Sequence, residues 1–177
     1  ELKDLTSISP QQLPEKQDKQ KYVNDCHIET DMEIMFPDNY VSNISERIRL
    51  YKNLNELKEE EELQDFESQL TDRFGDLPGP AKELFNLVRL RRKAIGMGIE
   101  KVILKKSIMI IHFTSNKESG FYARKACVYL LNYVNKRYSQ ISVKHTENKL
   151  SITVKNIASI EDAGRIFDNI QQFHEIP

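Results

Sequence analysis

The sequence predicts an α+β fold in which a helical first half is followed by two strand-strand-helix units. Between residues 43 and 98, apolar residues recur at intervals of three and four, which is the period of an amphipathic helix. From Ile99 onward, β-branched runs joined by short polar turns follow instead. Because strands joined by tight turns pair antiparallel, we expect a small antiparallel or mixed sheet covered by helices.

The first 25 residues are rich in Gln, Lys, Asp and Pro and hold few apolar positions. Such a segment buries too little surface to offset the entropy of ordering, so we interpret residues 1–25 as a linker or tail. The folded domain is then expected at residues 26–177. Within it, residues 27–35 alternate apolar and polar side chains and predict an edge strand, which Pro37 follows.

The first predicted helix begins after Asn43, because this residue and Glu46 can cap its N-terminus reciprocally. Its apolar residues recur along one face, which we expect to be buried. These residues are Ile44, Ile48, Tyr51 and Leu54.

A second helix is predicted to begin within the acidic run 59–62, since carboxylates near a helix N-terminus interact favourably with the helix dipole. Leu63, Phe66 and Leu70 form its inward face, and Gly75 is placed to end it. The outward face is a polar stripe at heptad-like spacing. The stripe consists of Glu62, Asp65, Gln69 and Asp72.

A third helix is predicted after Pro78 and Pro80, because proline fixes φ and suits a first helical turn, and Gly96 is suited to its end. Its inward face is Ala81, Leu84, Phe85, Val88 and Ile95. Another face carries a basic row made of Lys82, Asn86, Arg89 and Lys93.

The second half predicts two hairpins, each followed by a helix. Strands are expected at residues 99–105 and 108–113 around Lys106 and Ser107, and at 141–145 and 150–154 around Glu147 and Asn148. Helical spacing predicts helices at residues 120–138 and after Ser159, which Asp162 helps to cap. The expected inward face of the last helix is Ala163, Ile166, Phe167, Ile170 and Phe173.

Charge and cysteine content limit the classes of function. Lys and Arg number 26 against 27 Asp and Glu, so the chain has no net field for a polyanion or a membrane surface. Its two cysteines form no Cys-x-x-Cys pair, and no apolar run approaches the roughly 20 residues that span a bilayer. We therefore expect a reduced, cytoplasmic protein. Since the sequence begins at Glu1 without an initiator Met, we also expect a fragment of a longer protein.

No arrangement of residues predicts catalysis, a metal site or a cofactor site. A zinc site needs donors at short, definite spacings, whereas the cysteines and histidines here are scattered. Gly96 and Gly98 follow a helix, where a phosphate-binding loop would precede one. Consecutive carboxylates at residues 59–62 point around the helix and do not converge on a substrate. We expect a non-enzymatic domain.

Two clusters remain as candidate contact surfaces. A basic cluster on the third helix could bind phosphates, which predicts a nucleic-acid-binding accessory domain, although no aromatic residue accompanies it for base stacking. The commoner explanation of such residues is a solvated helix face or salt bridges to the acidic second helix. The cluster consists of Lys82, Arg89, Arg91, Arg92 and Lys93.

Asp72 and Arg73 form the second cluster, at the end of the second helix. An Asp carboxylate and an Arg guanidinium can both be exposed there while Phe74 turns inward, which is the chemistry of a charge-complementary protein contact. The alternative is that both residues only stabilise the following turn.

Several motifs together resemble the C-terminal domain of the bacterial transcription-repair coupling factor. They are Glu-Arg-Ile-Arg-Leu-Tyr-Lys at residues 46–52, Leu-Thr-Asp-Arg-Phe-Gly at 70–75, Leu-Pro at 77–78 and Arg-Leu-Arg at 89–91. The resemblance covers residues 31–98 and is a matter of element order beyond them. Gln69 departs from the family pattern, which usually has an acidic residue before this Leu-x-Asp-Arg-Phe-Gly motif.

The resemblance implies a terminal regulatory domain of a DNA translocase that removes stalled RNA polymerase and recruits excision repair. It implies that the domain folds back in cis on an N-terminal UvrB-like module and masks the surface that binds UvrA. ATP and Mg²⁺ would be bound by motor domains upstream, and polymerase and DNA would be partners of the full-length protein. We expect a monomer. The implied contact surface is Glu62, Asp65, Gln69, Asp72 and Arg73.

Overall fold

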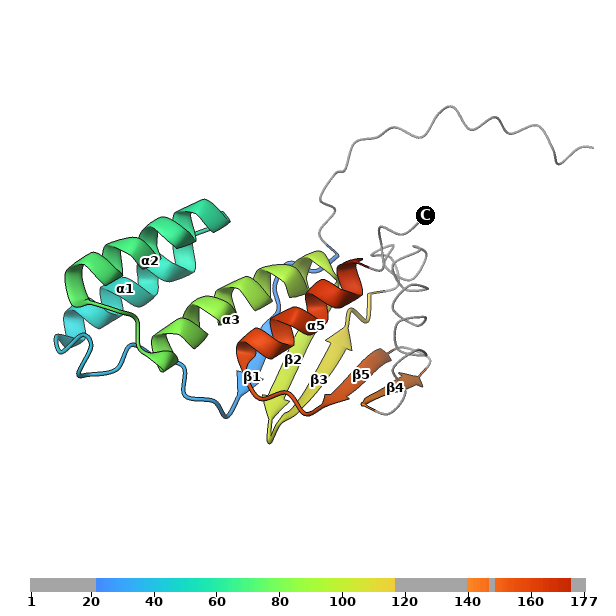
Figure 1. Ribbon diagram of the computed structural model, residues 1–177. Coiled ribbons are helices and arrows are strands. Elements are labelled where there is room, and N and C mark those ends of the chain that lie inside the picture. Colours follow the sequence, from blue (N-terminus) through green and yellow to red (C-terminus); the bar gives the residue numbers. More distant parts are fainter. Residues whose placement is uncertain (1–21, 117–139, 147–148, 173–177) are drawn as a thin grey trace, which may run out of the picture.

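The computed structural model describes residues 22–116, 140–146 and 149–172. Within these residues the chain forms a mixed sheet and four helices, which is the α+β arrangement that the sequence predicts (Figure 1). The strands are β1 (His27–Thr30), β2 (Ile99–Lys105), β3 (Ile108–Phe113), β4 (Ile141–Thr146) and β5 (Lys149–Lys155). The helices are α1 (Ile44–Glu56), α2 (Glu60–Phe74), α3 (Gly79–Gly96) and α5 (Ile160–Gln172).

The five strands lie in the order β1-β2-β3-β5-β4. β1 is an edge strand, as expected, and pairs parallel with β2, because α1, α2 and α3 form the crossover between the two strands. The other neighbours pair antiparallel. β1 is shorter than predicted and ends at Thr30, whose Oγ1 accepts a hydrogen bond from the Met32 N–H at 3.1 Å and turns the chain away.

The β2–β3 hairpin turns at Lys106 and Ser107, as predicted, with φ values of +53° and +57°. The Asp31 carboxylate supports this turn by accepting a hydrogen bond from the Lys106 N–H at 2.9 Å. Strands β4 and β5 pair as the second predicted hairpin, but its turn at Glu147 and Asn148 lies outside the described residues, as does the predicted helix at 120–138.

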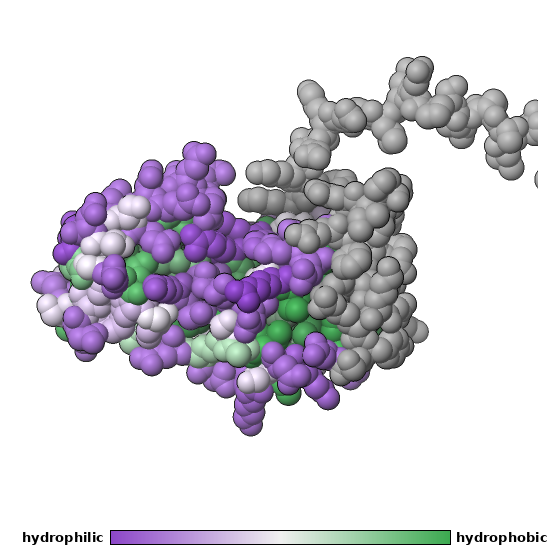
Figure 2. Space-filling view, viewed as in Figure 1, coloured by the Kyte–Doolittle hydropathy of each residue, from purple (hydrophilic) through white to green (hydrophobic). Residues whose placement is uncertain are grey.

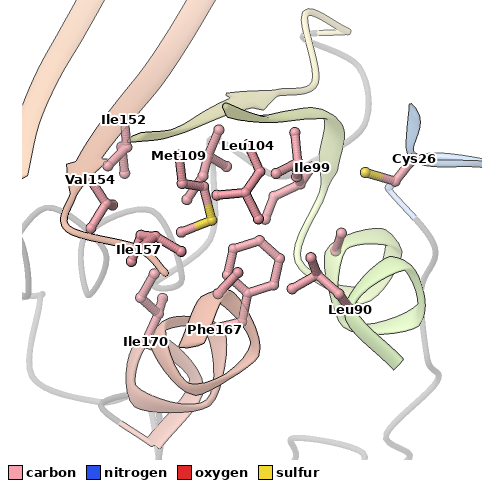
Figure 3. Close-up of a cluster of buried hydrophobic side chains, with 14 of the residues drawn as sticks. Cys26, Leu90, Ile99, Leu104, Met109, Ile152, Val154, Ile157, Phe167 and Ile170 are labelled. Carbon is pink, nitrogen blue, oxygen red and sulfur yellow. The ribbon is translucent and has the colours of Figure 1, made fainter. Parts of the chain in front are cut away.

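One hydrophobic core lies between the sheet and the helices α3 and α5, which cover the same face of the sheet (Figure 1). Alternate strand residues point into it, including Val102 and Leu104 of β2 and Met109 of β3. Figure 3 shows Phe167 of α5 pointing toward these strands, and its side chain is fully buried. Burial of a side chain of this size contributes about 1.5–3 kcal/mol.

A second core lies between α1, α2 and the first half of α3. It contains the predicted inward residues of α2, and α3 contributes Phe85 to it and Leu90 to the first core. Ile34 packs against both clusters. The chain therefore folds around two cores that one helix connects.

The prediction of which side of α1 is buried is wrong for three of the four residues. Ile44, Ile48 and Tyr51 are 66%, 51% and 36% exposed, whereas Leu50 and Leu54 are buried. Leu50 and Leu54 are four residues apart and form an apolar stripe of their own, and α1 packs through this stripe. The helix is therefore rotated relative to the prediction.

The predicted helix caps are largely present. The Asn43 side chain accepts a hydrogen bond from the Glu46 N–H at 3.0 Å, although the Glu46 carboxylate contacts arginines instead of completing the cap. Ser159 accepts a hydrogen bond from the Asp162 N–H at 3.0 Å, as expected. Glu83 of α3 adds an unpredicted contact, because its carboxylate accepts a hydrogen bond from the Ile160 N–H at 2.9 Å.

Candidate protein-interaction surface

The start of α2 is held by its own acidic residues. Glu62 accepts hydrogen bonds from the N–H groups of Lys58 and Glu59 at 2.8 and 3.0 Å, and these bonds lower the pKa of its carboxyl. The Glu62 side chain therefore caps the helix, although the sequence also places it in the outward stripe.

The end of α2 is fixed by Gly75 and Tyr40. Gly75 has φ +86°, a conformation that glycine adopts at no steric cost, and its N–H donates to the Thr71 carbonyl at 2.9 Å. The Tyr40 hydroxyl donates to the carbonyls of Gly75 and Leu70 at 2.9 and 3.3 Å. The Tyr40 ring also lies 5.7 Å from the ring of Phe74, which is half-buried as predicted.

The outer face of α2 is acidic and carries no cation. Asp65, Gln69 and Asp72 are exposed, as predicted, and no Lys or Arg occurs in α2 before Arg73. No other described residue forms an ion pair with Asp65 or Asp72. Hydrophilic residues cover most of the helical end of the molecule in Figure 2. We call the face of Asp65, Gln69 and Asp72 the α2 acidic face.

Arg73 has a structural partner inside the domain. Its guanidinium lies 2.7 Å from the carboxylate of Glu46 in α1 and 4.8 Å from the ring centroid of Phe74. Glu46 also pairs with Arg49 at 2.8 Å. Both arginines lower the pKa of the Glu46 carboxyl, and Arg73 has the larger effect. Sequence reasoning missed Glu46 as the partner, because 27 residues separate the two and no local spacing connects them.

The basic residues of α3 are largely engaged with carboxylates of the same domain. Arg89 lies 2.7 Å from Glu60 and 3.4 Å from Glu67, both in α2. Arg92 lies 3.6 Å from Glu60 and donates a hydrogen bond to the Leu57 carbonyl at 2.9 Å. Salt bridges to the acidic second helix, one of the explanations that the sequence offers, are therefore present.

The rest of the basic cluster contacts other elements. Arg91 pairs with Asp25 at 2.7 Å and lowers the pKa of that carboxyl, and Lys93 pairs with Asp168 of α5 at 2.6 Å. Lys82 is exposed and contacts none of the acidic residues that the structure describes. Four of the five basic residues thus connect α3 to α2, to α5 or to Asp25.

Metal binding and thiol chemistry find little support among the described residues. The residues in ranges 22–116, 140–146 and 149–172 contain no group of three or more His, Cys, Asp or Glu that could hold a metal ion. Burial, with the Asp25 carboxylate, raises the pKa of the Cys26 thiol to about 12, so this thiol is protonated near neutral pH. None of the described helices has the length and apolar character required to cross a membrane.

A family model of the TRCF domain matches residues 30–123, more than half of the chain. The chain belongs to the TRCF domain family. The Escherichia coli transcription-repair-coupling factor is 37% identical to it over 75 residues, which cover 42% of this chain and 6% of that protein. The Rickettsia bellii factor is 25% identical over 143 residues, covering 80% of this chain and 12% of that protein.

The TRCF domain therefore spans only a small fraction of the curated relatives that it matches. Its fold is similar to a crystal structure of the C-terminal domain of transcription-repair coupling factor, with a TM-score of 0.66 and 16% sequence identity. That match covers 86% of this chain and 97% of the other. The match supports the α+β fold.

Proposed function

We propose that this TRCF domain is the non-catalytic, regulatory part of a transcription-repair coupling factor. It restrains a DNA translocase that displaces stalled RNA polymerase and recruits excision repair. It does so by docking in cis on an N-terminal UvrB-like module and covering the surface of that module that binds UvrA. ATP and Mg²⁺ belong to motor domains outside this chain, and RNA polymerase and DNA are partners of the whole protein.

The α2 acidic face supports this proposal most directly. Asp65 and Asp72 are exposed carboxylates that no described residue neutralises, on a helix whose ends are firmly fixed. A rigid, single-sign surface attracts a complementary basic surface and sets its register. Gln69, which replaces an acidic residue of the family pattern, leaves two carboxylates to make this contact.

An exposed polar contact also suits a mask that must be released. Exposed ion pairs contribute about 0–1 kcal/mol each, so a face with two carboxylates holds a partner weakly. A tether compensates, because linked partners meet at an effective concentration of about 1 mM for short flexible linkers. A few kcal/mol of competing contacts elsewhere in the protein is then enough to shift the equilibrium to the open state.

Titration calorimetry of this domain with the UvrB-like module at low salt tests the proposal. The informative variant is Asp65→Lys/Asp72→Lys, which reverses the face without touching the Arg73–Glu46 pair. Glu33→Lys/Glu56→Lys is the matched control, because both residues are exposed acidic residues outside α2. We expect at least tenfold weaker binding for the first variant only. Equal binding of wild type and both variants would refute the role of the α2 acidic face.

DNA binding through α3, the alternative function, is not favoured by the geometry. Arg89, Arg92 and Lys93 would have to leave carboxylates at 2.6–3.6 Å to reach phosphates. Fluorescence anisotropy with duplex DNA checks this alternative directly. Salt-sensitive binding that Arg89→Gln/Lys93→Gln abolishes would favour it over the protein contact.

A further inference from the structure

The sheet has one face that none of the described helices covers. α3 and α5 both lie on the opposite face, where Val102, Leu104 and Met109 are fully buried (Figure 1). Strand residues point alternately to the two faces, so Ile103 and Ile110 point away from these helices. Both side chains are only partly buried, which agrees with an open face.

The strand register arranges the side chains of this face in three rows that run across the strands. The middle row contains Ile103, Ile110 and Thr153. The rows on either side carry lysines, with Lys101 and Lys144 in one row and Lys105 and Lys155 in the other. We call these three rows the open sheet face.

Positive charge predominates on the open sheet face. Among the residues that the strand pairings place in the three rows, one is a carboxylate, Glu29 of the edge strand β1. Glu29 lies 2.6 Å from Lys101 and 3.3 Å from Lys105. Lys144 and Lys155 are exposed and form no ion pair with any residue in the ranges 22–116, 140–146 and 149–172. The chain as a whole has a net charge of −1, so its charge is segregated, and this face is complementary to an acidic partner.

The spacing of the rows fits an α-helix. Adjacent rows are two residues apart along a strand, so the two lysine rows lie about 13 Å from each other. An α-helix with its side chains is about 10–12 Å in diameter, so a helix that lies on Ile103 and Ile110 has lysines along both of its flanks. From β1 to β4 the face spans four strand spacings, about 19 Å, which about 13 helical residues cover. An apolar centre with a charged rim is also typical of protein interfaces.

Charge and chemistry disfavour other occupants. A second copy of the same face would place lysines opposite lysines. A single-stranded nucleic acid would find cations for its phosphates, but the three rows offer no Phe, Tyr or Trp for base stacking. Its charged backbone would also cover the apolar middle row. Residues 117–139 contain more Lys and Arg than Asp and Glu, so they do not match this face in charge either.

We propose that the open sheet face binds an acidic amphipathic helix of a partner protein. The apolar stripe of that helix packs on Ile103 and Ile110, and carboxylates on its two flanks pair with the two lysine rows. The α2 acidic face lies at the other, helical end of the molecule (Figure 1). The domain can therefore hold two partners of opposite charge at the same time.

Methyl and amide NMR of the whole chain tests this proposal with a designed peptide as the probe. The peptide forms a helix of about 13 residues with a leucine stripe and glutamates on both flanks. In a comparison peptide, lysine replaces every glutamate. We expect saturable shifts of the Ile103 and Ile110 signals with the glutamate peptide only. No shift of these signals, or equal shifts with both peptides, overturns the proposal.

The variant Lys144→Gln/Lys155→Gln tests the charge on the face, because it removes one unpaired lysine from each outer row. We expect at least fivefold weaker binding of the glutamate peptide. The matched control is Lys52→Gln/Lys82→Gln, since these lysines of α1 and α3 are also exposed and form no ion pair with a described residue. Equal weakening in both variants would show that only the overall charge attracts the peptide, and would overturn the proposal.

The variant Ile103→Thr/Ile110→Thr tests the apolar row and keeps β-branched side chains in the strands. We expect at least tenfold weaker binding, whereas Ile44→Thr/Ile48→Thr, which changes two exposed isoleucines of α1, should bind as wild type. A single-stranded DNA oligonucleotide that binds the face more tightly than the peptide overturns the proposal, and so do Ile110 signals that shift with protein concentration alone. The UvrB-like module is not needed, so this result is independent of the proposed masking function.

Discussion

Tyr40→Phe removes one hydroxyl group and tests how the corner at the end of α2 is held. That hydroxyl donates to the Gly75 and Leu70 carbonyls at 2.9 and 3.3 Å, whereas the ring contact with Phe74 survives the change. A hydrogen bond of this kind contributes about 0.5–1.5 kcal/mol net. Because the Gly75 carbonyl is exposed and water can replace the hydroxyl there, we expect the lower half of this range.

Urea unfolding monitored by circular dichroism measures the effect. A loss of about 0.5–1 kcal/mol lowers the melting temperature by about 1–4 °C for a chain of this size. The denaturant slope should stay unchanged, since the substitution alters little buried area. A free energy of unfolding within about 0.2 kcal/mol of wild type would show that the hydroxyl does not stabilise the corner.

Hydrogen exchange locates the effect. The Gly75 N–H, which bonds to the Thr71 carbonyl at 2.9 Å, should exchange faster in Tyr40→Phe. The Arg47 N–H, bonded to the Asn43 carbonyl at 3.0 Å at the start of α1, serves as the internal control. Equal acceleration at both sites would indicate global destabilisation and would refute a local role for Tyr40.

Three further changes test other parts of the fold. Ser107→Gly should raise stability by about 0.5–1 kcal/mol in urea unfolding, because φ of +57° strains a side chain that has a Cβ; a loss would contradict this. Lys101, with Lys105, lowers the pKa of Glu29 from 4.5 to about 2, so the carboxylate stabilises the fold above about pH 4.5 and this contribution is lost as the pH falls toward 2. Glu29→Gln should therefore flatten the dependence of melting temperature on pH in that window, and an unchanged profile would refute the argument. Phe167→Ala should cost about 3–5 kcal/mol in the same unfolding assay, and a cost below about 1 kcal/mol would mean that the cavity collapses.

The spacing of apolar residues along the sequence predicts which segments become helices or strands, but it does not always predict which side of each segment is buried. In α2 the inward residues are correct, because Leu63 and Phe66 belong to its only apolar face. In α1, two apolar stripes compete, one through Ile48 and one through Leu50, and periodicity cannot choose between them. The choice is made by the packing of α1 against α2 and α3, which is tertiary information.

The candidate site was predicted in part for the same reason. The outward position of Asp72 follows from helical geometry, and the structure shows it exposed. The partners of Arg73 and Arg89 lie 27 and 29 residues away in the sequence, so no local rule could assign them. Likewise, the parallel pairing of β1 with β2 depends on a crossover of three helices, which the turn signals of the second half do not report.

The single helix that joins the two cores has a mechanical consequence. α3 is an 18-residue rod, about 27 Å long, with Phe85 fixed among the helices and Leu90 fixed beneath the sheet. Because α3 is one continuous helix anchored in both cores, we expect a force on the outer face of α2 to reach the strands through α3. Under the proposed docking of the α2 acidic face, the domain should therefore separate from its partner as one rigid body, without a change of its own fold.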